Sequence, residues 1–123
     1  MSSEPVDIWK RLKKLSRIRI KICGRIRRLN LVINHRTVKL QQIGRKYTLI
    51  SAFLELRRDE LSEEQIDLLL DMMVHYGKRI DQLTEDIGDL AEPSSELFRE
   101  LDDVENQITA LEAIVEAEVS SSD

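Results

Sequence analysis

The stretch that decides the fold of this chain is residues 8–54, which reads IWKRLKKLSRIRIKICGRIRRLNLVINHRTVKLQQIGRKYTLISAFL. With Leu12 placed at position a of a seven-residue repeat, sixteen a and d positions fall between Ile8 and Leu61, and thirteen of them are apolar. Such 3-4 spacing keeps one face of a helix apolar and is typical of coiled coils. The stretch therefore predicts a long helix over residues 8–61. We call its a and d positions the inner seam: Ile8, Leu12, Leu15, Arg19, Ile22, Ile26, Leu29, Ile33, Arg36, Leu40, Ile43, Tyr47, Ile50, Leu54, Arg57 and Leu61.

A β-hairpin competes with this helix over part of the same stretch. Residues 17–22 alternate basic and apolar side chains with a period of two, and Cys23-Gly24 could form a turn. A small β element between residues 16 and 50 is therefore an alternative. The unbroken heptad register favours the helix, because a strand has no reason to preserve it.

Two shorter helices follow the long one. Ser62 and Gln65 have the spacing of a capping box, so a second helix is expected over residues 62–91. Pro93 disfavours helical geometry in the residue before it, and Ser94 or Ser95 can cap a third helix over residues 95–119. Residues 1–7 and 120–123 are expected to be flexible ends.

The lengths of these helices predict their arrangement. The second and third helices together match the first in length, so they can form a return limb with a break in its middle. We therefore expect one all-α domain, a long antiparallel helical hairpin or coiled coil with a broken return limb. A three-helix bundle, with the third helix folded back once more, is the alternative.

Charge is strongly segregated along the chain. Residues 1–58 hold 16 basic and 3 acidic side chains, whereas residues 59–123 hold 3 basic and 20 acidic ones. Either the basic half binds an external polyanion, or it meets the acidic half of the same or another copy. The hairpin favours the second interpretation, and it predicts charge pairing of Arg19 with Asp103 or Glu105 and of Arg36 with Asp86.

The long helix carries more apolar residues than its inner seam uses. An outer stripe runs along its other side, while Ile18, Val32 and Phe53 are expected to widen the inner seam. Apolar stripes on two sides of one helix imply contacts on both sides. Self-association or pairing with a helical protein is therefore expected, unless the third helix of a three-helix bundle covers the stripe. The residues of this outer stripe are Ile20, Gly24, Leu31, Val38, Leu49, Ala52 and Leu56.

The basic segment over residues 10–28 suggests a different function. It could bind the phosphates of a nucleic acid without sequence preference, because only one aromatic residue, Trp9, lies near it. An anionic membrane surface is a third candidate, since Trp9 stands at the end of a basic amphipathic helix. The basic residues of this segment are Lys10, Arg11, Lys13, Lys14, Arg17, Arg19, Lys21, Arg25, Arg27 and Arg28.

Catalysis finds little support in the sequence. The chain has two histidines, His35 and His75, which are far apart, and one cysteine, Cys23. No spacing indicates a metal site, a catalytic residue or a phosphate loop, so we expect no cofactor and no small-molecule substrate. Without a secretory signal or an apolar run that could span a membrane, a cytoplasmic location is expected. The sequence thus predicts a non-enzymatic coiled-coil interaction or scaffolding module.

Overall fold

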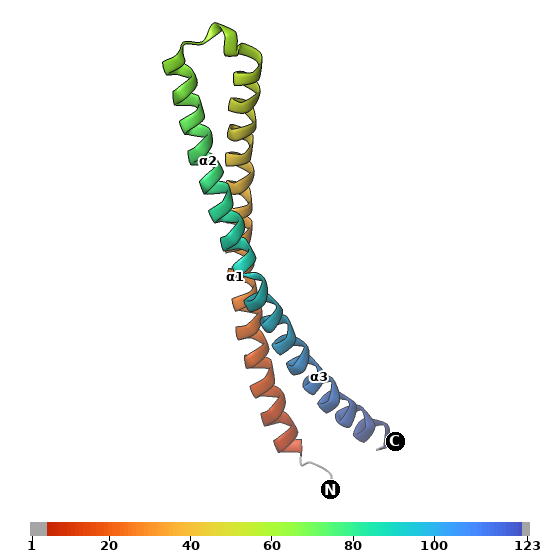
Figure 1. Cartoon of the computed structure of the whole chain (residues 1–123). Coiled ribbons are helices and arrows are strands. Elements are labelled where there is room, and N and C mark those ends of the chain that lie inside the picture. Colours follow the sequence, from red (N-terminus) through yellow and green to blue (C-terminus); the bar gives the residue numbers. More distant parts are fainter. Residues whose placement is uncertain (1–4, 122–123) are drawn as a thin grey trace. The chain divides into compact units, whose positions relative to one another are not determined.

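The described part of the chain, residues 5–121 of a computed structural model, contains helices and no strand (Figure 1). In chain order these are α1 (Pro5–Arg57), the short 3-10 helix η1 (Arg58–Glu60), α2 (Glu63–Asp89) and α3 (Ala91–Ser121). The all-α prediction is confirmed. The alternative β element is wrong, because residues 16–50 lie inside α1, where the heptad register continues without a break.

The chain divides into two units, each a pair of helices. Unit 1 joins the first part of α1, up to Asn30, with α3, and unit 2 comprises residues 31–91, the rest of α1 with η1 and α2. Within unit 2, α1 and α2 form an antiparallel hairpin closed by η1 (Figure 1). The third helix therefore packs on the first part of α1, as a broken return limb requires. The alternative three-helix bundle does not form, since α3 has the opening segment of α1 as its neighbour within unit 1.

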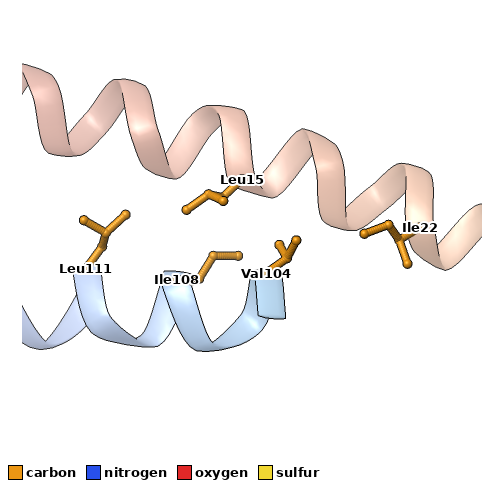
Figure 2. Close-up of a cluster of buried hydrophobic side chains, with 5 residues drawn as sticks. All are labelled: Leu15, Ile22, Val104, Ile108 and Leu111. Atoms are coloured by element: carbon orange, nitrogen blue, oxygen red, sulfur yellow. The ribbon is translucent and has the colours of Figure 1, made fainter. Parts of the chain in front are cut away.

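Unit 1 owes its stability to apolar side chains that interdigitate between α1 and α3. Leu15 and Ile22 of α1 point toward Val104, Ile108 and Leu111 of α3, and the two helices run in opposite directions (Figure 2). Leu111 is the most completely enclosed, with 2% of its surface exposed. Half-buried neighbours extend this cluster along both helices: Leu12, Ile18, Ile26, Leu97 and Leu101.

The contact between α1 and α2 in unit 2 buries fewer side chains than the contact between α1 and α3 in unit 1. Leu54 of α1 and Leu83 of α2 are its buried residues among those described. Gly77 lies against Tyr47, since a Cβ added to this glycine would be 4.0 Å from Cε2 of the tyrosine. Two helices alone cannot enclose a seam on every side, so most seam residues here remain half-buried.

The turn between α1 and α2 is built from local hydrogen bonds. Arg57 donates from Nη1 to both carboxylate oxygens of Glu60, at 3.1 and 3.0 Å, and the backbone N–H of Leu61 donates to the carbonyl of Arg58. The capping box predicted at the start of α2 is confirmed. The backbone N–H of Gln65 donates to Oγ of Ser62 at 3.1 Å, and the Ser62 N–H donates to Oε1 of Gln65 at 3.0 Å.

The break between α2 and α3 lies earlier than Pro93, Ser94 and Ser95 predicted. Helix α2 ends at Asp89 and α3 begins at Ala91, with Leu90 between them, so Pro93 sits in the first turn of α3. Proline is tolerated there because the first N–H groups of a helix have no partner within it. At the chain ends, α1 already begins at Pro5 and α3 continues to Ser121; the rest of the expected flexible ends lies outside the described residues.

Candidate interaction surfaces

The inner seam faces the partner helix in both units. Its apolar residues on α1 are buried or half-buried, apart from Tyr47, which is 37% exposed. Of the three arginines at seam positions, Arg19 and Arg36 are half-buried and Arg57 is exposed in the turn. Because the seam already has its partner within the chain, other surfaces must carry any contact with further molecules.

The outer stripe lies on the opposite side of α1 and is exposed. In unit 2 the exposed fractions of its large side chains are 62% for Leu31, 52% for Val38, 69% for Leu49 and 80% for Leu56. Such values place the four side chains in water, although each belongs to a type that favours burial. The prediction of a second apolar side to this helix therefore agrees with where these residues lie.

The end of α1 nearest the turn carries the densest part of this stripe. Leu49, Ala52, Phe53 and Leu56 line a shallow hollow of about 470 Å³ together with Ile50. The lining is almost wholly apolar, and nothing in unit 2 covers it among the residues that are described. A hollow of this kind accepts an apolar side chain of another molecule better than a polar ligand.

Two of the three residues expected to widen the inner seam lie partly on the outer surface. Val32 and Phe53 were expected to widen the seam, yet their side chains are 41% and 46% exposed. They stand one position before a seam residue, whereas Ile18, at the same position in unit 1, is half-buried against the cluster formed with α3. Residue spacing did not single out Leu68 and Val74, two exposed residues on the outer side of α2.

In unit 1, α1 exposes fewer large apolar side chains than it does in unit 2. Ile20 is exposed like the large side chains of the outer stripe in unit 2, and Trp9 is exposed beside a hollow of about 320 Å³ formed with Ile8, Leu12 and Val115. Glu118 of α3 also lines this hollow. Trp9 therefore leaves most of its surface in water.

Most cations of residues 10–28 point away from α3. Residues three or four apart share a helix face, so one row runs through Lys10, Lys14, Arg17 and Lys21, opposite the seam residues Leu15 and Ile22. Lys13 joins four of these residues around an open hollow of about 440 Å³. Arg11, Arg25, Arg27 and Arg28 are also exposed, but Arg11 and Arg25 directly precede seam residues and therefore flank the contact with α3. We call the row Lys10, Lys14, Arg17, Lys21 and Arg28 the basic outer face.

Oppositely charged side chains rarely meet in the described residues. The ion pair between Arg57 and Glu60, 3.0 Å from Nη1 to Oε2, is the one that lies within 4.0 Å across residues 7–121. Arg19 and Arg36 therefore form no ion pair of this length with the predicted acids. Asp86 is half-buried, and Asp103 and Glu105 are exposed. Pairing of these charges between helices stays a prediction.

Metal-ligating side chains do not gather in the part of the chain that the structure describes: no group of three or more His, Cys, Asp or Glu residues there could hold a metal ion. His75 has a tilted ring contact with Tyr76, with centroids 5.8 Å apart, and Cys23 is an exposed free thiol. Among the same residues, no helix has the length and apolar content needed to cross a membrane.

Two surfaces thus stand out on α1: an apolar outer stripe in unit 2 and a basic outer face in unit 1. Both lie on the side of α1 that faces away from its partner helix, and both follow the same 3-4 spacing. No protein-family model, curated protein or solved structure matches this chain.

Proposed function

We propose that this protein is a non-enzymatic coiled-coil interaction module that self-associates through the outer stripe of α1. The observation that carries the proposal is the exposure of Leu31, Val38, Leu49 and Leu56, each more than half in water on one side of a single helix. Large apolar side chains that recur on an exposed face mark contacts with other proteins. A helical protein of another sequence would fit the same surface.

The spacing of the stripe favours a helix as its occupant, and a second copy as the source of that helix. Side chains in 3-4 spacing form the ridge that packs into the groove of another helix. In the described residues, the exposed apolar side chains of α2, such as Leu68 and Val74, do not repeat in this way. The stripe on α1 is therefore the surface on this chain that best complements itself.

Light scattering after size exclusion tests this function over a range of concentrations up to tens of micromolar. We expect a mass above that of one chain, and a decrease toward the monomer on dilution. The Leu56→Asp variant should stay monomeric, because it would bury a carboxylate in the apolar contact. As a matched control, Leu68→Asp places the same charge on the outer side of α2 and should leave the mass unchanged. A wild-type chain that is monomeric throughout would contradict self-association and point to a different helical partner.

A second candidate function is supported by the basic outer face of unit 1. Its cations have no carboxylate within 4.0 Å among the described residues, and the contact with α3 lies on the other side of the helix. Phosphates of a nucleic acid could therefore bind them without separating the two helices. A membrane surface fits the basic segment less well, because interfacial helices insert their apolar face, and in unit 1 the inner seam of α1 is covered by α3.

Binding of labelled double-stranded DNA at several salt concentrations tests this candidate. Each phosphate contact contributes about 0.9 to the slope of log affinity against log salt, so the variant K14Q/R17Q/K21Q should lower that slope by about 2.7. The control variant R11Q/R19Q/R25Q removes the same number of charges from the inner seam and the flank beside α3, and it should change the slope little. Equal losses in the two variants, or no binding by the intact chain, would contradict a DNA-binding outer face.

A further inference from the structure

The outer face of α1 in unit 2 has a sequence that reads similarly from both ends at six of its eight positions, the exceptions being His35 and Ala52. Its 3-4 spacing runs through eight positions, which we call the outer seam: Leu31, His35, Val38, Gln42, Arg45, Leu49, Ala52 and Leu56. Leucine occupies both ends, and Val38 and Leu49 occupy the third position from either end. The two central positions are polar. A pattern with this symmetry complements itself when one copy is turned end over end.

From this symmetry we infer that two copies pair their outer seams antiparallel, about a two-fold axis between Gln42 and Arg45. This geometry rests on the proposed self-association and specifies how it occurs. Each Leu31 then packs beside Leu56 of the other copy, and each Val38 beside Leu49. A closed pair of this kind is the commonest symmetry of soluble oligomers.

Residues flanking the outer seam fit the same arrangement. In an antiparallel pair, the residues along one flank of the seam face the residues along the same flank of the second copy. Val32 and Phe53 occupy one such flank and are directed partly into solvent in the single chain. In the pair, Val32 of one copy lies near Phe53 of the other. Val32 and Phe53, which the single chain leaves partly in water, would then cover each other at both ends of the contact.

A parallel pair is disfavoured by charge. In register, it would place Arg45 beside Arg45 of the second copy, and like charges at neighbouring positions repel. Since α1 is one continuous helix, the same parallel contact would continue into Arg17 and Lys21 of the basic outer face and oppose each cation with itself. In the antiparallel pair, Arg45 instead lies beside Gln42, whose side-chain carbonyl can accept a hydrogen bond from the guanidinium.

The antiparallel contact also ends where the character of α1 changes. Leu31 aligns with Leu56 of the second copy, whose α1 ends at Arg57, so residues before Leu31 have no counterpart. The basic outer face of unit 1 therefore lies outside the contact. A polar pair at the centre, Gln42 with Arg45, would fix the register at some cost in affinity, as a single polar residue does in other coiled coils.

Disulfide cross-linking between differently labelled chains tests the geometry. The chains carry Cys23→Ser together with either Leu31→Cys or Leu56→Cys. Each chain is oxidised alone, and a mixture of the two chains is oxidised in parallel. A disulfide requires Cα atoms within about 7 Å. In the antiparallel pair, residue 31 lies beside residue 56, whereas the two copies of residue 31 are about 37 Å apart along the axis. We expect cross-links in the mixture and none in either chain alone.

Other outcomes separate this geometry from self-association in general. Cross-linking of the Leu31→Cys chain with itself would indicate a parallel pair and overturn the inference. A dimer by light scattering with no cross-link in the mixture would also overturn it, while leaving self-association intact. A monomer by light scattering would contradict both. The Cys23→Ser, Leu68→Cys chain is the control, since its thiol on α2 is equally accessible and should form no cross-link with any chain.

Discussion

Replacing Leu49 by alanine should weaken the dimer strongly and leave the single chain intact. In the single chain, 69% of the Leu49 surface is exposed, and this area is available for burial against the second copy. The substitution removes three carbon atoms, each contributing about 0.8 kcal/mol when buried, so the loss scaled to that exposed fraction is about 1.7 kcal/mol per copy. Two-fold symmetry doubles the loss to about 3.3 kcal/mol, which raises the dissociation constant roughly two hundredfold.

Sedimentation equilibrium measures this dissociation constant directly, and circular dichroism measures the helix content and thermal unfolding of the same samples. Under conditions where the protein is monomeric, the thermal stability of the Leu49→Ala chain should equal or slightly exceed that of the wild type, because alanine is the best helix former. The control Leu68→Ala removes the same atoms from a side chain that is 61% exposed on α2, outside the proposed contact. If Leu49→Ala left the dissociation constant unchanged, or if Leu68→Ala raised it equally, assigning the contact to the outer seam would be refuted.

Three further predictions concern the stability of the single chain, each read by thermal or urea unfolding followed by circular dichroism. Leu111→Ala should lower the free energy of unfolding by about 2–4 kcal/mol, since it empties the centre of the unit 1 cluster, and a loss near zero would mean that α3 is not packed there in solution. Ser62→Ala should cost about 1 kcal/mol by removing the capping box, whereas the exposed Ser95→Ala should cost little; equal effects would argue against the cap. Gly77→Ala should stabilise the chain by about 0.5–1 kcal/mol, because alanine favours a helix more than glycine does and the added Cβ meets Tyr47 only at an ordinary contact distance. Destabilisation would indicate a tighter approach of α1 and α2.

Much of the local structure could be predicted because it depends on residues close in sequence. The heptad spacing selects which side of each helix is apolar, and Ser62 and Gln65 bond to each other across one helical turn. The break near Pro93 was expected, but its position was not. Proline disfavours a helix that runs into it, yet fits the first turn of a helix that begins just before it, and the spacing of residues does not distinguish these cases.

The candidate surfaces were predictable as stripes, but their exposure was not. Val32 and Phe53 have positions that a third helix would bury and a helix pair leaves half in water. Likewise, Arg11 and Lys14 belong to one run of cations, and their separation into a flank and an outer face depends on where α3 packs. Charge complementarity suggested contacts between the halves, but long exposed side chains gain little by meeting in water.

By itself, the sequence determined that this protein is helical, which face of each helix is apolar, and where α2 begins. These properties follow from side-chain spacing and short-range hydrogen bonds. Only the tertiary structure decided that α3 covers the inner seam of α1 in unit 1 and that the outer stripe stays exposed in unit 2. The physical reason is that α1 has two apolar sides, and spacing alone does not say which of them a neighbouring helix will bury.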